Sequence, residues 1–212
     1  MNTLIIKSKR KHSFNPKNIK IKEQFYTICN NIESNLTKAN PILLMVTSLT
    51  QTKSMVNATA YLALAFSEQG KRVLLVDGNL SEPSLHHLFM IDNSSGLTSL
   101  LLGEQPQLGD NSIKITDNLF CLPTGEVLDE PSTLLSKETL PILAKEWKQH
   151  FDIILLHTSN SQNTPDAQIV AKYCDGIVLV IKEGQDKLEK IVSVKKQFER
   201  AKHEITGTVI IK

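Results

Sequence analysis

The chain is 212 residues long, with 41% hydrophobic and 22% charged residues and a formal net charge of +2, a composition typical of a soluble globular domain. No apolar run approaches the roughly 18 residues that a membrane-spanning helix needs, and the first residues lack the pattern of a secretory signal. We therefore expect a cytoplasmic protein whose three cysteines stay reduced.

The basic residues are unevenly distributed along the chain. Residues 1–22 contain seven basic and no acidic residues, which leaves 17 basic against 22 acidic residues, a net −5, in the remainder. We expect residues 1–20 to form a basic flexible N-terminal tail and residues 21–212 to form a single domain. The tail could be a solvated segment or could touch an anionic membrane surface, which would place the protein at the inner face of the membrane. We do not expect nucleic acid as its partner.

Hydrophobic periodicity predicts alternating helices and strands. Apolar residues at three- and four-residue intervals indicate an amphipathic helix at the start of the domain, and continuous apolar runs indicate buried strands. The predicted helices span residues 20–36, 55–69, 81–89, 96–104, 130–151, 165–174 and 186–202, with Pro141 bending or dividing the fifth. The predicted strands span residues 42–48, 71–77, 118–125, 151–159, 175–184 and 205–212.

This alternation predicts an α/β fold with a doubly wound, mostly parallel sheet in a three-layer sandwich. Ligands of such folds bind beyond the carboxyl ends of the strands. In this chain those ends correspond to residues 48–54, 77–81, 124–129 and 157–162.

Several sequence segments within about residues 23–211 point to one family. They include VTS…NATAYLALAFSEQGKRVLLVDGNL, GLTSLLLGE, FDIILLHTS and DGIVLVIKEG, and together they resemble the cytoplasmic kinase domain of bacterial tyrosine kinases of the CpsD/CapB group, within the MinD/ParA-like P-loop ATPases. The resemblance implies a P-loop NTPase-like domain, a role in capsule or exopolysaccharide biosynthesis and export, and Mg·ATP as the cofactor of active members.

The phosphate-binding loop of that family reads approximately S-x-x-P-G-E-G-K-[ST] and aligns without a gap after the first predicted strand. Thr52 and Ser54 align with the two glycines of the motif. Met55 aligns with the lysine that binds phosphate, and Val56 aligns with the residue whose hydroxyl binds magnesium. Glycine lets the backbone approach phosphate, lysine supplies a cation, and the hydroxyl coordinates magnesium. Lys53 could replace the missing cation, or could be a solvent-facing loop lysine.

The two acidic motifs of the family are also altered. Of its D-x-D-x-R motif only Asp77 remains, with Asn79 at the second acidic position, and His157 stands where the Walker B aspartate is expected. An imidazole cannot supply the carboxylate that a hard cation prefers. Asp77 and His157 could instead form a hydrogen-bonded dyad or part of a metal site, or could be a structural pair.

Two features linked to assembly and phosphorylation in the family differ as well. The ring-forming motif E-x-x-R-x-x-R reads Glu23, Tyr26 and Cys29, so both arginines are absent. The family's tyrosine cluster is expected after the last strand, and we expect this chain to have no such tail.

The sequence therefore favours a catalytically inactive, pseudo-kinase scaffold or regulatory component that is not an enzyme, with no cofactor and no metal. Its expected partner is a membrane polysaccharide co-polymerase or an active kinase homologue, in a monomer or hetero-complex rather than an octameric ring. The alternative is a divergent ATP-dependent protein tyrosine kinase or ATPase that uses Lys53, or the corner formed by Asp77 and His157. A third class is a positioning factor that binds membrane or DNA through the basic tail.

Overall fold

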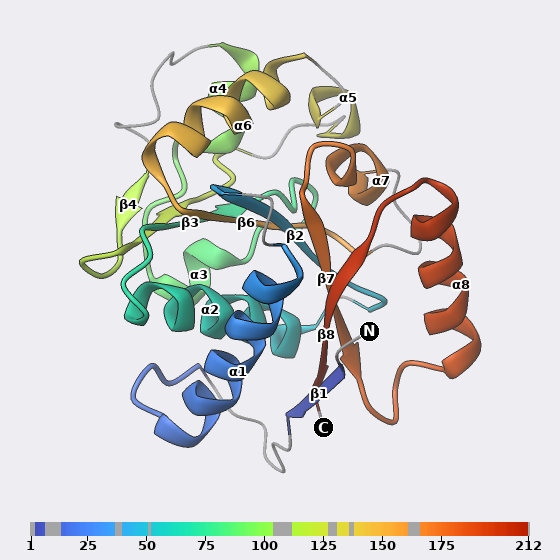
Figure 1. The fold of residues 1–212 in the computed structure, drawn as a ribbon. Helices are drawn as coiled ribbons and strands as arrows, with labels where there is room; N and C mark the ends of the chain where they lie inside the picture. Colours follow the sequence, from blue (N-terminus) through green and yellow to red (C-terminus); the bar gives the residue numbers. More distant parts are fainter. Residues whose placement is uncertain are drawn as a thin grey trace.

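The computed structural model shows one sheet enclosed between two layers of helices (Figure 1). It describes residues 3–6, 14–36, 40–50, 52–103, 112–126, 131–135, 138–160 and 166–211. The strands are β1 (Thr3–Ile6), β2 (Ile42–Ser48), β3 (Val73–Asp77), β4 (Ile113–Lys114), β5 (Leu119–Leu122), β6 (Ile153–His157), β7 (Gly176–Lys182) and β8 (Ile205–Ile211). The helices are α1 (Ile19–Asn35), α2 (Lys53–Glu68), α3 (Leu85–Phe89), α4 (Leu97–Leu102), α5 (Pro131–Leu135), α6 (Thr139–His150), α7 (Asp166–Ala171) and α8 (Leu188–Arg200).

The strand order confirms the predicted doubly wound α/β fold. Within the described residues the sheet has eight strands in the order β1-β8-β7-β2-β6-β3-β5-β4. Every neighbouring pair is parallel except the short pair of β4 and β5. All residues of β2, β3 and β6 are buried, as expected for a parallel sheet covered on both faces.

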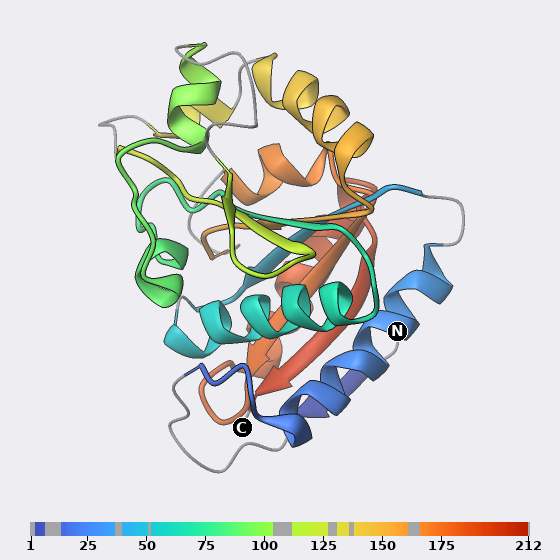
Figure 2. The same ribbon diagram turned by 90° about the vertical axis from the view of Figure 1, so that its left-hand side faces the viewer.

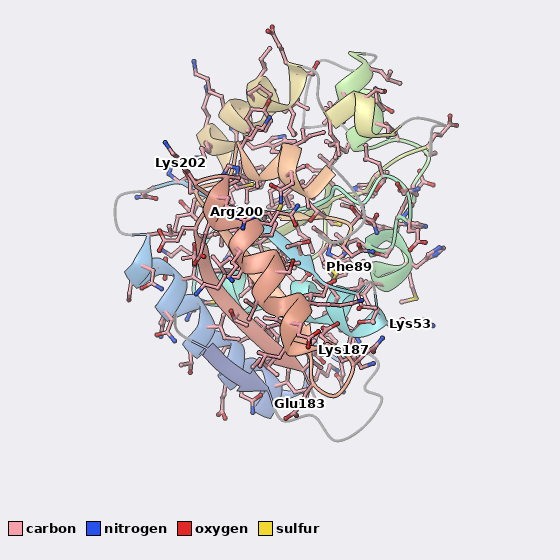
Figure 3. All side chains as sticks on the ribbon, turned by 90° about the vertical axis from the view of Figure 1, so that its right-hand side faces the viewer. Lys53, Phe89, Glu183, Lys187, Arg200 and Lys202 are labelled. Carbon is pink, nitrogen blue, oxygen red and sulfur yellow. The ribbon has the colours of Figure 1, made fainter. Side chains whose placement is uncertain are left out.

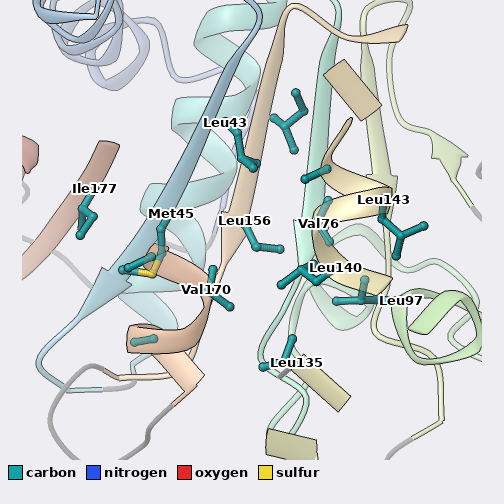
Figure 4. Close-up of a cluster of buried hydrophobic side chains, with 14 of the residues drawn as sticks. Leu43, Met45, Val76, Leu97, Leu135, Leu140, Leu143, Leu156, Val170 and Ile177 are labelled. Atoms are coloured by element: carbon teal, nitrogen blue, oxygen red, sulfur yellow. The ribbon is translucent and has the colours of Figure 1, made fainter. Parts of the chain in front are cut away.

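Alternate residues of the strands divide the core into two apolar clusters. On β2, Ile42, Leu44 and Val46 face the cluster that includes residues of α1, α2 and α3, whereas Leu43 and Met45 face the cluster that includes residues of α4 to α8. Figure 4 shows part of the second cluster. Figure 2 shows α1 and α2 packed together on one side of the sheet and α4 and α6 on the other. The three-layer arrangement is therefore a direct consequence of the side-chain period of a strand.

The N-terminal segment differs from the predicted flexible tail. Residues Thr3–Ile6 form β1, which pairs in parallel with β8 in the register Thr3 to Thr208 through Ile6 to Ile211. The apolar, β-branched residues of this segment suit a sheet edge. Residues 7–13, which hold four of the predicted tail's basic residues, lie outside the described residues, so the tail and domain boundary remain a prediction.

Pro141 neither bends nor divides a helix. The long helix expected over residues 130–151 is instead two helices, α5 and α6, and Pro141 lies in the first turn of α6. A proline is tolerated there because the first backbone N–H groups of a helix have no partner within the helix. None of the helices in the described ranges combines the length and apolar character needed to cross a membrane.

The segment before α4 packs against the loop after β5 at a glycine. The backbone N–H of Leu97 donates to the carbonyl of Pro123 at 2.9 Å, and that of Thr98 donates to the carbonyl of Thr124 at 2.8 Å. A Cβ atom on Gly96 would lie 2.1 Å from the Pro123 carbonyl oxygen. Only glycine therefore lets these two segments approach so closely.

We expect Gly96→Ala to lower the free energy of unfolding by about 3 kcal/mol or more, the upper end of the cost of overpacking, because the added Cβ meets backbone atoms that must move. Urea denaturation measures this loss. Gly184→Ala is the matched control, because Gly184 has a φ of +77° and open space around its Cβ position. That variant should cost only the left-handed penalty of about 1 to 2 kcal/mol. Equal losses in the two variants would contradict the close approach at Gly96.

Candidate functional site

The segment aligned with the phosphate-binding loop joins β2 to α2. Thr52 is the N-cap of α2, with an extended backbone (φ −148°, ψ 154°), and its side-chain oxygen accepts a hydrogen bond from the backbone N–H of Met55 at 3.3 Å. This is the usual role of threonine at a helix start. A residue expected to replace a glycine therefore caps the helix, which begins at Lys53, two residues earlier than predicted.

The side chains at the aligned lysine and hydroxyl positions lie in the core. Met55 is 1% exposed and Val56 is 7% exposed, and both belong to the apolar cluster between the sheet and α2. The sulfur of Met55 lies 3.0 Å from the hydroxyl oxygen of Ser48 at the end of β2. Ser54 is half-buried. Lys53 is exposed and lies at the periphery of the molecule (Figure 3).

A side-chain hydrogen bond ties the loop after β2 to the turn before α8. The hydroxyl of Thr50 donates to Oδ1 of Asp186 at 2.9 Å, and Oδ2 of Asp186 accepts from the backbone N–H of Lys182 at 2.7 Å. Sequence reasoning missed this residue, because an acidic residue just before a helix is normally taken as a capping residue of that helix. Here its carboxylate joins the loop after β2 to the last residue of the neighbouring strand β7.

Asp77 ends β3 with a fully buried carboxylate. Its Oδ2 accepts hydrogen bonds from the backbone N–H groups of Ser84 and Leu85, both at 2.8 Å, and its Oδ1 accepts one from the N–H of Asn79 at 3.3 Å. A buried charge needs such donors. Asn79 in turn closes the following turn by donating to the carbonyl of Glu82 at 2.7 Å. Both side chains thus organise the segment between β3 and α3.

His157 ends β6 opposite Asp77 in the β-ladder and is fully buried. Its Nδ1 lies 3.2 Å from the hydroxyl of Thr59, and its Nε2 lies 3.4 Å from the hydroxyl of Ser84. The Thr59 hydroxyl donates to the carbonyl of Met55 at 3.1 Å, so we assign the imidazole proton to Nδ1, which donates to Thr59. Burial lowers the pKa of His157, although the charge of Asp77 opposes the shift.

The structure therefore brings Asp77 and His157 together through a third residue. Ser84 donates its backbone N–H to Asp77 and places its hydroxyl beside His157. No sequence pattern singles out Thr59, which lies within a helix, and only a weak one marks Ser84, which follows Pro83 before a short helix. Among the residues that the structure describes, no group of three or more His, Cys, Asp or Glu side chains is placed to hold a metal ion.

The helix face aligned with the ring-forming motif is partly turned towards α2. The Tyr26 hydroxyl donates to Oε2 of Glu68 at 2.5 Å, and the Lys22 ammonium donates to Oε1 of the same carboxylate at 2.7 Å. The hydrogen bond to Glu68 is the main reason that the pKa of Tyr26 rises to about 12. Cys29 is fully buried, and Glu23 is exposed. These α1 residues stabilise the contact of α1 with α2.

Several solved structures share this fold. The chimerical protein CapA2B2 superposes with a TM-score of 0.88 at 24% identity, covering 99% of this chain and 93% of that one. The kinase domain of the Escherichia coli tyrosine kinase ETK gives 0.87 at 21% identity, covering 98% and 85%. The septum site-determining protein MinD of Pyrococcus horikoshii, complexed with Mg-ADP, gives 0.67 at 24% identity, covering 80% and 69%. These likenesses establish the P-loop NTPase fold.

The buried imidazole predicts a pH-dependent stability. Because burial lowers the pKa of His157 below the ordinary value of 6.5, the unfolded chain takes up this proton at a higher pH than the folded chain does. The free energy of unfolding should then be unaffected above pH about 6.5 and fall as the pH drops below it. We expect His157→Gln to show a smaller fall between about pH 7 and pH 5 in urea denaturation, with part of the fall retained because burial also lowers the pKa of His86 and His203.

His150→Gln is the control, because this imidazole is exposed at the end of α6. The control should keep the full fall in stability at acid pH. A fall that is the same in His157→Gln and in the unchanged protein would show that His157 is not held neutral in the folded chain.

Curated relatives place the chain in a family, although no protein-family model matches it. The tyrosine-protein kinase YwqD of Bacillus subtilis is 31% identical over 188 residues, which cover 89% of this chain and 79% of that protein. The putative tyrosine-protein kinase CapB of Staphylococcus aureus is 27% identical over 194 residues, covering 91% and 84%.

These relatives contradict the prediction that the chain is not an enzyme. They are named as tyrosine-protein kinases, which points to an enzyme. The prediction was wrong because it took the identities of a few residues, among them Met55 and His157, as sufficient to decide the activity of the whole chain. The resemblance on which the sequence analysis rested is confirmed: the chain belongs to the family of bacterial tyrosine-protein kinases.

Proposed function

We propose that this chain is a scaffolding or regulatory member of the bacterial tyrosine-kinase family, which works in the cytoplasm in capsule or exopolysaccharide biosynthesis and export by binding other proteins. The observation that carries the proposal is the burial of Met55, 1% exposed, at the position aligned with the phosphate-gripping lysine. The names of the relatives support the family's place in tyrosine phosphorylation.

The residues at the strand ends do not fit Mg·ATP in the manner of a P-loop. Met55 offers no charge to phosphate, Val56 offers no oxygen to magnesium, and the imidazole of His157 is already occupied by hydroxyl groups of the protein. Three lost charge-assisted contacts, those of the lysine, the hydroxyl and the Walker B carboxylate, at roughly 1.5 to 3 kcal/mol each would weaken binding by about 4.5 to 9 kcal/mol. At 1.4 kcal/mol per tenfold change, a micromolar site becomes millimolar or weaker. We therefore propose that this chain holds no tightly bound nucleotide cofactor.

The proposed partner is a membrane polysaccharide co-polymerase or an active kinase of the same family. Contact of the basic residues near the N-terminus with the inner face of the membrane is part of this proposal. It is tested by sedimentation with anionic vesicles before and after Lys9, Arg10 and Lys11 are changed to Glu. Loss of vesicle binding in that variant would support the contact.

A second candidate function is a divergent ATP-dependent tyrosine kinase or ATPase, which the names of the relatives favour. In this function Lys53 would turn inward to the phosphates, or Asp77 and His157 would act together. Both carboxylate oxygens of Asp77 already accept backbone hydrogen bonds. The Lys53 route is therefore the more direct one to test.

Calorimetry with Mg·ATP separates the two functions. We expect a dissociation constant in the millimolar range or weaker for the unchanged chain, because the cation and the magnesium ligand are missing. The double variant Met55→Lys with Val56→Thr should bind at least about tenfold more tightly, whereas the apolar control Met55→Leu should not. Submillimolar binding by the unchanged chain that Lys53→Ala abolishes would favour the kinase, and transfer of labelled phosphate to a tyrosine substrate would establish it.

The altered ring motif leads us to propose a monomer or a hetero-complex. Tyr26 and Lys22 both bind Glu68 of the same chain, and Cys29 is buried. Size-exclusion chromatography with light scattering should give the monomer mass of 23.7 kDa over a series of concentrations. A discrete species of about eight times that mass would show that a ring forms without the arginines.

A further inference from the structure

Helix α8 stands at the outside of the helical layer, beside the last strand (Figure 3). It buries Val194 and Phe198 and partly buries Ile191. These three residues lie at three- and four-residue intervals, so they form one side of the helix. The opposite side of α8 faces outward.

That outward side carries a stripe of four residues, which we call the α8 stripe. Leu188 is 73% exposed and Val192 is 40% exposed, and Lys196 and Arg200, both exposed, continue the stripe at the same four-residue interval. Residues four apart are neighbours on a helix surface. The stripe therefore joins an apolar half to a cationic half.

The charge of this region is opposite to that of most of the molecule. Residues 187–202 contain six basic and two acidic residues, a net +4, which leaves a net −2 in the rest of the chain, whose total is +2. Of these cations, Lys195 pairs with Glu199 at 3.4 Å. Lys196 and Arg200 border a surface hollow of about 590 Å³ that is also lined by Ser193, Gln197 and Ala201. No acidic residue is among the described residues that line this hollow.

We propose that the α8 stripe and its hollow form a docking site for an acidic peptide segment of a partner protein. Carboxylates of the peptide would pair with Lys196 and Arg200 above the hollow, and an apolar side chain of the peptide would cover Leu188 and Val192. Arginine and lysine clusters recognise acidic motifs in this way, and a guanidinium can hold a carboxylate with two hydrogen bonds. Complementary charge also speeds and orients the encounter.

The observations favour a peptide over a membrane surface. The described residues that line the hollow all belong to α8 and its C-cap, so the two cations are presented along one helix, where the side chains of an extended peptide can reach both. The exposed residues Glu189 and Glu199 interrupt the basic residues of the helix, and an anionic bilayer would be repelled by both. The proposed site goes beyond the proposed function, since it depends neither on the nucleotide site nor on the identity of the system.

Fluorescence anisotropy with a fluorescein-labelled peptide of alternating glutamate and leucine tests the site. We expect saturable binding that weakens with rising salt, because screening reduces the charge pairs. Lys196→Glu with Arg200→Glu should weaken binding at least about tenfold, and Leu188→Ser with Val192→Ser by about threefold or more. The matched control Lys114→Glu with Lys145→Glu makes the same charge change at two exposed lysines on β4 and α6, and should leave binding within about twofold.

Circular dichroism of each variant confirms that it is folded before binding is compared. Equal weakening by the control variant would overturn the site, since it would show general charge attraction. Equal binding of a peptide with glutamine in place of glutamate would also overturn it. A third outcome would overturn the site as well. If the peptide does not bind, but phosphatidylserine vesicles bind and Lys196→Glu with Arg200→Glu abolishes the vesicle binding, the stripe is a membrane-binding surface.

Discussion

The central constraint on this molecule is that a parallel sheet must be covered on both faces. Its central strands β2, β3 and β6 are largely apolar, because each successive side chain enters one of two cores. On these three strands the charged and titratable side chains stand only where the strands end. Ser48, Asp77 and His157 all occupy such ends, and they define the edge at which ligands of doubly wound folds bind.

At this edge the buried polar side chains form hydrogen bonds with other groups of the same chain. Asp77 accepts three backbone N–H groups, and His157 lies between two hydroxyls, those of Thr59 and Ser84. Met55 fills the core beneath the loop with a thioether in place of a charge. A buried polar network that is fully satisfied holds one arrangement firmly. These contacts therefore fix the positions of the strand ends and of the segments that follow them.

The sequence could predict most of the fold, because burial on two faces leaves a clear pattern of apolar runs. The strand over residues 42–48 was predicted with its observed bounds. Strand β1 was missed, since its pairing with β8 joins residues about two hundred positions apart and leaves no local signal. The candidate residues were found from alignment with a motif, but the partners Thr59, Ser84 and Asp186 were not, because each contact joins residues far apart in the chain. The activity was misjudged because residue identities at one loop do not define a family's chemistry.

The hydrogen bond between Thr50 and Asp186 links two regions that the sequence separates by 136 residues. One end of the link is the loop that follows β2, and the other is the turn that begins α8. A displacement of α8 along its axis must either break this bond or carry the loop with it. The hydrogen bond thus couples the position of α8 to the loop that follows β2, a central strand of the sheet.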